Sequence, residues 1–270
     1  MSTDLTKPKQ DLVIPNYLKV EGDTSLDVAK QYARPPRIKV IQSLSDQKLR
    51  DAFGVGATIL VPDNTLLMDV VRDEKGNVQP AMSQPFTFTP IFFFVEFCLW
   101  NPLEMKGELS AIRERSFDQK SRLAIRARDF ANRTQPCPEN VAYECSFCEH
   151  LNFIVDVHGQ KEPCILTFSR GEFKTGTTFL TLLKVRSVPI YGNIFEAHLA
   201  HRHGTKGDWF GLDPSNPSGG ESPFVGEEAF QKYRKLHEKC VTDHAEELIK
   251  VNYEDDPIDV DSVSTAASTM

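Results

Sequence analysis

Cysteine residues cluster in the segment "PCPENVAYECSFCEHLNF", where they could bind a metal ion. Cys145 and Cys148 have the C-x-x-C spacing of a zinc knuckle, in which one tight turn supplies two thiolates. Cys137 is a candidate third ligand, and His150 is the nearest fourth, with Cys164 as an alternative. The pattern predicts a loop insertion that binds Zn²⁺ in a structural role, because clustered cysteines in a cytosolic chain indicate a metal before a disulfide. The alternative is a loop in which these cysteines are reduced thiols that bind no metal.

Motifs of the common enzyme classes are missing from the sequence. It contains no GxxxxGK[ST], no GxSxG, no dinucleotide-binding GxGxxG, no HExxH and no zinc-deaminase pattern. His198, His201 and His203 form "HLAHRH", and such clusters are mostly solvent-facing or satisfy local hydrogen bonds. We therefore predict that the protein is not an enzyme, with a metal-dependent nuclease as a weaker alternative.

Aromatic residues dominate "IFFFVEFCLW" at 91–100, which we predict to be a strand. Alternation along a strand divides these residues between two faces. One face would carry Phe92, Phe94, Glu96 and Trp100, and the other Ile91, Phe93, Val95, Phe97 and Leu99. Both faces are apolar, so the pattern fits a strand buried on both sides, and it also permits a platform on which bases stack. Trp100 is the better contact candidate because it adjoins a charged segment.

Basic residues could neutralise phosphate groups beside these rings. Between Lys106 and Arg133 the chain has eight basic and four acidic residues, and "KGDWFGL" sets a lysine beside two rings. Any single cation could be a solvated surface charge, so the prediction depends on the cluster. The predicted nucleic-acid-binding residues are Phe92, Phe94, Trp100, Arg113, Arg115, Lys120, Arg122, Arg126, Lys174, Lys184, Arg186, Lys206, Trp209 and Phe210.

The elements that must position these residues are mainly short strands. We predict strands over 65–73 and 86–100, and "LNFIVDVH" and "PCILTFS" suit a hairpin across "GQKE". Helical patterns occur in "SDQKLRDAF", with Ser45 as its N-cap, and in "GEFKTGTTFLTLLKVR". Near the C-terminus an amphipathic helix would align Phe230, Tyr233, Leu236 and Cys240 on one face. The fold class is therefore mainly β with peripheral helices (α+β), built around a compact β-barrel.

Charge and composition divide the chain into three parts. Residues 1–34 read as a flexible N-terminal arm, 35–253 as the folded domain with its C-terminal helix, and 254–270 as a disordered acidic tail. The tail contains Glu254, Asp255, Asp256, Asp259 and Asp261. Without them the net charge of −7 falls to a near balance of 33 acidic and 31 basic residues. The polar N-terminus and the lack of a long apolar run predict a cytoplasmic protein without membrane contact.

The order of these segments resembles that of bacteriophage single-stranded-DNA-binding proteins built on an oligonucleotide-binding (OB) barrel. The matching stretches are "PPRIKVIQSLSDQ", "EPCILTFSRGEFKTGTTFLTLL", "VPIYGNIFEAHLAH" and "KGDWFGLDP", followed by a helix and an acidic tail. The resemblance implies an OB-like domain that binds single-stranded DNA without sequence preference during replication or recombination, in the host cytoplasm. It also implies that the acidic tail recruits replication or recombination proteins.

A function of another class stays open. The zinc loop and the acidic tail could bind a polymerase, which would make the protein an interaction or transcription-regulating factor without direct DNA contact. Phosphate contacts release counterions, so a DNA binder should lose affinity steeply as salt rises. A salt series with an oligo-dT strand distinguishes the two functions.

Overall fold

The computed structural model describes residues 34–100, 112–132, 146–204 and 207–253, and these residues are mainly β with peripheral helices, as predicted. The strands are β1 Arg37–Val40, β2 Thr58–Val61, β3 Thr65–Met68, β4 Phe86–Trp100, β5 Ile112–Ser116, β6 Ser146–Val157, β7 Cys164–Ser169, β8 Phe195–Gly204 and β9 Gly207–Ser215. The α-helices are α2 Gln47–Phe53, α3 Arg122–Asn132, α5 Phe173–Arg186 and α6 Glu227–Ala245. Short 3₁₀ turns are η2 Pro80–Met82, η4 Arg170–Glu172 and η5 Ile190–Gly192.

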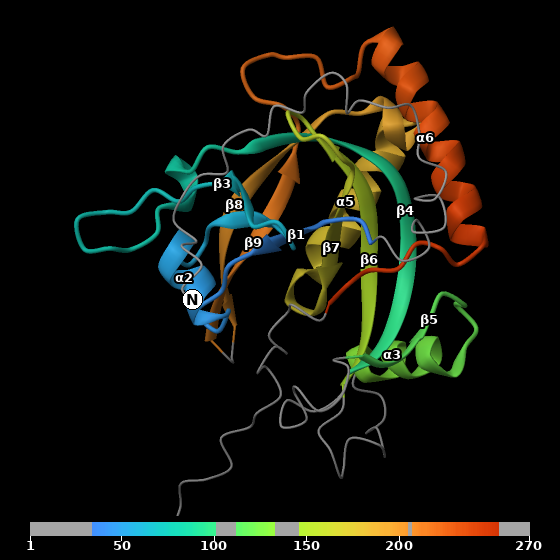
Figure 1. Cartoon of the computed structure of the whole chain (residues 1–270), viewed down its shortest axis with the longest axis horizontal. Coiled ribbons are helices and arrows are strands. Elements are labelled where there is room, and N and C mark those ends of the chain that lie inside the picture. The colour runs from blue at the N-terminus through green and yellow to red at the C-terminus, as the bar shows by residue number, and fades with distance from the viewer. Residues whose placement is uncertain (1–33, 101–111, 133–145, 205–206, 254–270) are drawn as a thin grey trace, which may run out of the picture. The chain divides into compact units, whose positions relative to one another are not determined.

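All nine strands join one sheet in the order β3-β2-β1-β7-β6-β4-β8-β9, with β5 also paired to β4. The pairs are antiparallel except β1 with β7, which run parallel. Figure 1 shows β4 bending strongly along its length, so that the sheet curls into a half-barrel. The predicted hairpin of "LNFIVDVH" and "PCILTFS" is confirmed as β6 and β7.

Helices cover both faces of this curled sheet (Figure 1). Inside the curl, α5 buries Phe179 and Leu183 against β6, β7 and β8. On the outer face, α6 places Tyr233 and Cys240 in a second cluster, with Leu236 packed against it. The helical periodicity of both segments is thus confirmed, although three threonines of α5 are exposed. No helix among the described residues is long and apolar enough to cross a lipid bilayer.

A bulge in β4 changes which side chains face the interior of the curl. The pairing of β4 with β6 shifts between Pro90 and Phe92, where proline cannot donate a ladder hydrogen bond. As a result Ile91 and Phe92 both contact the outer cluster, although they are consecutive. The two predicted faces of this strand are therefore observed, except that Ile91 lies on the face opposite to the predicted one.

Two local predictions were wrong because polar side chains cap the backbone. The strand predicted over 65–73 ends at Met68, since Asp69 accepts a hydrogen bond from the N–H of Val70 and Asp73 organises the following turn. The N-cap of α2 is Asp46, whose carboxylate accepts from the N–H of Lys48 at 2.8 Å. Ser45 instead accepts from the N–H of Gln42 at 2.9 Å.

The Gln42 side chain joins the end of β1 to β9. Its Nε2 donates to the carbonyl oxygen of Phe210 at 2.7 Å, and its Oε1 accepts from the N–H of Phe210 at 2.9 Å. A neighbouring strand would likewise donate one hydrogen bond to the backbone of Phe210 and accept one from it, and here the single side-chain amide of Gln42 makes both. The side chain thus bridges two strands that do not pair directly.

Replacing Gln42 by Ala should destabilise the fold by about 1–3 kcal/mol, because two hydrogen bonds of about 0.5–1.5 kcal/mol each are lost. Urea unfolding measures the loss, and hydrogen exchange should show a deprotected Phe210 amide. Ser43→Ala, which changes an exposed neighbour, serves as the control. Wild-type protection of the Phe210 amide in the Gln42 variant would contradict the bridging role.

Candidate nucleic-acid interface

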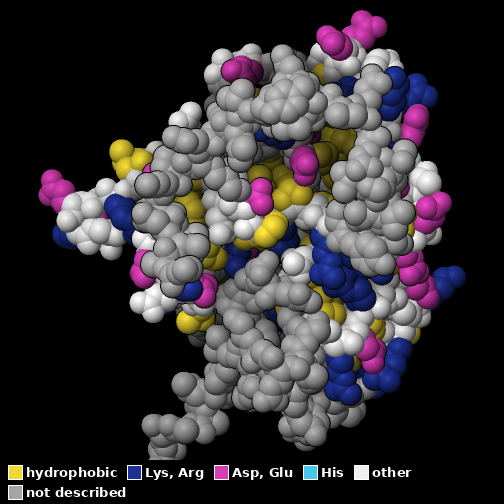
Figure 2. Space-filling view, in the orientation of Figure 1, with side chains coloured by type: hydrophobic (Ala, Val, Ile, Leu, Met, Phe, Trp, Pro, Cys, Tyr) yellow, Lys and Arg dark blue, Asp and Glu magenta, His cyan; other side chains and the backbone are white. Residues whose placement is uncertain are grey.

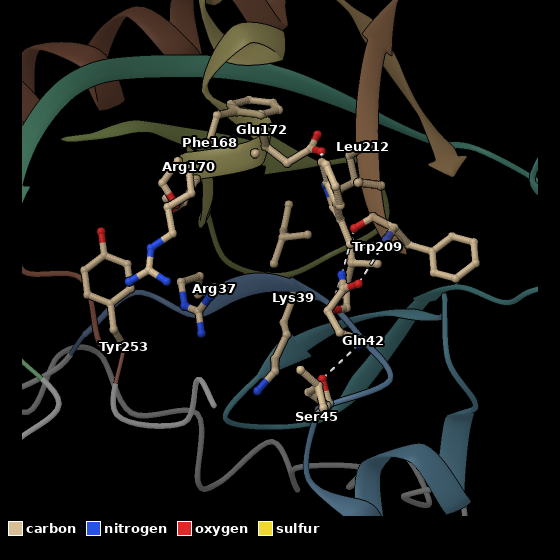
Figure 3. Close-up of a pocket in the computed structure, with 18 of the residues that line it drawn as sticks. Arg37, Lys39, Gln42, Ser45, Phe168, Arg170, Glu172, Trp209, Leu212 and Tyr253 are labelled. Carbon is tan, nitrogen blue, oxygen red and sulfur yellow. Dashed lines mark hydrogen bonds between the residues drawn. The ribbon is translucent and has the colours of Figure 1, made fainter. Parts of the chain in front are cut away.

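A cleft of about 400 Å³ opens between β1, the end of β7 and β9. Its lining combines cations with aromatic rings, which is the combination that single-stranded nucleic acids require. The lining residues used below are Arg37, Lys39, Gln42, Trp100, His150, Phe168, Arg170, Glu172, Trp209, Phe210 and Tyr253. Figure 3 shows Arg37, Arg170 and Tyr253 on one side of the cleft and Trp209 with Gln42 on the other. In Figure 2, Lys and Arg side chains gather beside hydrophobic ones near the middle of this face.

Three cations form one wall of the cleft. Arg37 and Lys39 alternate along β1 with Ile38 and Val40, so both basic side chains leave the strand on the same face. The Arg37 guanidinium lies 5.6 Å from the ring centre of Tyr253, and its Nε donates to the carbonyl oxygen of Asn252 at 3.1 Å. Arg37 and Lys39 are 7 % and 5 % exposed, so the first strand of the sheet places two largely buried cations in the lining of the cleft.

Arg170 adds the third cation from the short turn η4 after β7. Its guanidinium lies 5.4 Å from the ring centre of Trp100, a cation–π distance. The residue has a left-handed backbone with φ of 48°, which a non-glycine residue adopts at some cost in free energy. The turn therefore brings a cation to the cleft beside an aromatic ring.

Trp209 of β9 forms the opposite wall. Its indole Nε1 donates to Oε1 of Glu172 at 2.8 Å, and the same carboxylate oxygen accepts from Nε of Arg202 at 3.2 Å. Arg202 also pairs with Asp213, and hydrogen bonds to both carboxylates raise the pKa of its guanidinium. Arg202 balances only one of the two carboxylates, so Glu172, Asp213 and Arg202 together keep one net negative charge behind Trp209.

Two glycines give the Trp209 ring its space. A Cβ atom on Gly171 would lie 2.8 Å from the indole, and one on Gly204 would lie 2.7 Å from its six-membered ring. Both distances are below van der Waals contact, so side chains at either position would displace the ring. The indole is thus held in one orientation at the edge of the cleft.

Buried polar residues lie under the cationic wall. Tyr253 donates its hydroxyl to Oε2 of Glu96 at 2.9 Å, and Nη1 of Arg115 lies 3.3 Å from Oε1, an ion-pair contact without hydrogen-bond geometry. Burial raises the pKa of the Glu96 carboxyl, and Arg115 opposes this only in part. Burial, with nearby arginines, lowers the pKa of His150 to about 3, so its imidazole is neutral. The cleft therefore borders a buried, strongly polar cluster.

The aromatic residues predicted to bind nucleic acid separate into two groups. Trp100, Trp209 and Phe210 line the cleft, with Trp100 largely buried and the other two rings half-buried. Phe92 and Phe94 are instead packed between β4 and α6, where both contact the imidazole of His244. They do not line the cleft, because α6 covers the face of β4 that the sequence offered as a platform.

The predicted cations do not gather around the cleft. Arg113, Lys120 and Arg122 are exposed near β5 and α3, Arg126 is half-buried on α3, and Lys174 and Lys184 are exposed on α5. Arg115 is held by Glu96 and by the carbonyl oxygen of Val251. Arg186 is half-buried over Phe195 and donates to Asn193 at 3.0 Å. These two arginines are therefore engaged within the domain, and Lys206 lies outside the described residues.

The predicted metal and partner residues are described only in part. Cys148 and His150 lie within β6, in a strand where the zinc-knuckle prediction expected a tight turn. Cys137 and Cys145 lie outside the described residues, as do Glu254, Asp255, Asp256, Asp259 and Asp261 of the tail. On β8, His201 and His203 share a face, and both lie near the Asp208 carboxylate on the surface.

Sequence reasoning missed Arg37, Lys39, Arg170 and Tyr253. The alternation of basic and apolar residues in "RIKV" was a usable signal, because it puts Arg37 and Lys39 on the side opposite the core. Arg170 and Tyr253 offered no such signal. They reach the cleft only through the turn after β7 and the chain segment that follows α6.

Comparison with known proteins identifies a family. No curated protein and no solved structure matches the chain significantly. A model of the Pam3 phage gp34-like protein family, however, matches residues 13–242, which include every described strand and most of α6. This agrees with the phage part of the resemblance seen in the sequence and does not address DNA binding. Because the match covers well over half of its length, the chain belongs to the Pam3 phage gp34-like protein family.

Proposed function

We propose that the protein binds single-stranded DNA without sequence preference in phage replication or recombination. The observation that carries the proposal is the cleft, in which Arg37, Lys39 and Arg170 lie opposite Trp209. Cations neutralise phosphates and release counterions, whereas rings stack on bases of any sequence for about 1–3 kcal/mol per base. On this proposal the protein is a binding protein rather than an enzyme, and the OB topology implied by the sequence resemblance stays a prediction.

The size of the cleft favours a flexible strand over a duplex. A volume of about 400 Å³ is that of a small-ligand site, so it suits one or a few nucleotides whose bases are unpaired. A duplex would present its bases stacked and paired, and the indole of Trp209 could not reach their faces. The charge and the size of the cleft thus both favour a single-stranded nucleic acid.

A titration of fluorescent oligo-dT with the purified full chain, repeated over a salt series, tests the proposal. We expect binding whose affinity falls linearly with the logarithm of salt concentration, and similar affinities for oligo-dT and for mixed sequences. A duplex of equal length should bind more weakly. If no oligonucleotide binds even at low salt, the alternative of a polymerase-binding factor without DNA contact gains support.

Tyr253 lines the cleft, and the acidic residues Glu254, Asp255 and Asp256 follow it directly in the sequence. We propose that the tail competes with DNA for the cationic wall and recruits partner proteins. Deleting 254–270 should therefore tighten oligo-dT binding at low salt, with the difference shrinking at high salt as charges are screened. A full-length variant in which the five acidic residues are changed to Asn or Gln should show the same increase in oligo-dT affinity as the deletion. Unchanged low-salt affinity in both variants would contradict the competition.

A further inference from the structure

Strands β4 and β6 bring four potential metal ligands together on one face. In their antiparallel register Glu96 is directly opposite His150, and Cys98 is directly opposite Cys148. Residues two apart on a strand share a face, so the four side chains form a square of neighbours. The set contains two thiols, one imidazole and one carboxylate, the donor types that Zn²⁺ uses in proteins.

The geometry of three of these groups already approaches that of a metal site. A carboxylate oxygen of Glu96, Sγ of Cys98 and a ring nitrogen of His150 all lie within 4.8 Å of one another, and all three residues are buried. Ligand atoms on a tetrahedral zinc ion lie about 3.5 Å apart, as follows from bond lengths of about 2.0–2.3 Å. Small side-chain adjustments are therefore enough to bring the three groups onto one ion.

His150 supplies the second, independent observation. The residue is 2 % exposed, and neither ring nitrogen has a hydrogen-bond partner among the described residues. A buried polar atom without a hydrogen-bond partner destabilises the fold by about 1–3 kcal/mol, so the unpaired imidazole of His150 indicates that a ligand binds there. A metal ion bound by one nitrogen would satisfy that atom.

We infer that Glu96, Cys98 and His150 bind a Zn²⁺ ion in a structural role, with Cys148 as the fourth ligand. Cys148 now donates weakly to the carbonyl oxygen of Glu149 at 3.8 Å, and Arg170 lies beside its thiol, so its Sγ must leave these contacts to bind the ion. Two thiolates and one carboxylate carry three negative charges, which Zn²⁺ and the neighbouring Arg115 balance. Such an ion would tie β4 to β6 directly beside the cleft, since His150 lines it.

This site differs from the knuckle that the sequence predicts. It keeps Cys148 and His150, but it takes Glu96 and Cys98 from a strand far away in the sequence in place of Cys137 and Cys145. The inference does not depend on DNA binding, because it concerns only the buried face of two paired strands. The metal-site inference and the DNA-binding proposal can therefore be disproved independently of each other.

Metal analysis of the full chain tests the inference. Protein refolded with Zn²⁺ and freed of excess metal should retain one ion per chain. Protein refolded with Co²⁺ should show thiolate-to-cobalt charge-transfer absorption together with the d–d bands of tetrahedral coordination. Chelation should lower the unfolding temperature. Absence of retained metal and of the cobalt spectrum in the wild-type chain overturns the inference without recourse to any variant.

Variants then locate the ion. Cys98→Ala and His150→Ala should lose the zinc and the cobalt spectrum, whereas Cys240→Ala, which removes a buried thiol from α6, should keep both. Circular dichroism establishes whether each variant is folded. If Cys98→Ala or His150→Ala does not fold, the cobalt spectra of Cys137→Ala and Cys145→Ala distinguish the β4–β6 site from the sequence-predicted knuckle. Retention of the wild-type spectrum in those two supports the β4–β6 site. Its loss there assigns the metal to the sequence-predicted knuckle and overturns the inference.

Discussion

We expect the double replacement Lys39→Gln and Arg170→Gln to lower the affinity for oligo-dT by at least about 100-fold at low salt, since each charge-assisted hydrogen bond to a phosphate contributes about 1.5–3 kcal/mol. Both residues line the cleft, from β1 and from the turn after β7. The salt dependence should weaken as well, its logarithmic slope falling by about 1.4 because each lost phosphate contact of a single strand accounts for about 0.7. Fluorescence anisotropy over a salt series measures both quantities.

The matched control is Lys174→Gln with Lys184→Gln. It makes the same change in net charge, but on exposed positions of α5 that do not line the cleft. We expect only a small, non-specific decrease in affinity, with thermal unfolding confirming that both double variants are folded. Should the α5 pair lose as much affinity as the cleft pair, the DNA would lie elsewhere and the assignment of the cleft would be wrong.

Replacing Phe179 by Ala should destabilise the domain by about 3–5 kcal/mol, the range for a phenylalanine removed from a packed core. The ring is 2 % exposed and lies 5.0 Å from that of Phe153 and 4.9 Å from that of Phe195, centre to centre. It thus anchors α5 inside the curl of the sheet. In a domain of this size the loss corresponds to a decrease in unfolding temperature of roughly 10 °C, which calorimetry measures.

Val185→Ala on the same helix is the control for this change. Val185 is 73 % exposed, so its truncation should alter the free energy of unfolding by no more than about 0.5 kcal/mol. Equal stabilities of the Phe179 and Val185 variants would mean that α5 does not contribute its apolar face to the core.

Local sequence patterns predicted the elements well. Periodicity of 3.6 residues identified α5 and α6, and the density of aromatic residues identified β4. The packing of α6 on the outer face could not be predicted in this way, because nothing local indicates which face of β4 a helix more than 120 positions later in the chain will cover. For that reason Phe92 and Phe94 looked like possible ligand contacts and are instead packed against α6.

The candidate site was less predictable than the fold because it is assembled from distant segments. β1 pairs in parallel with β7, a contact between residues more than 100 positions apart, and this pairing places Arg37 and Lys39 beside Arg170. The square of Glu96, Cys98, Cys148 and His150 likewise depends on the register of β4 with β6. A register is set by the bulge at Pro90 and by long-range packing, and neither can be read from spacing alone.

The amide of Gln42 has a mechanical consequence for how the proposed ligand would be engaged. Two hydrogen bonds to Phe210 contribute about 1–3 kcal/mol, so thermal motion separates them far more often than it separates a full strand ladder. The rest of the β8–β9 hairpin is anchored more firmly, because β8 pairs with β4, Leu199 and Leu212 pack in the core, and Trp209 donates to Glu172. Loss of the Gln42 bridge would therefore loosen the contact of β9 with the end of β1 at the cleft and leave the hairpin in place.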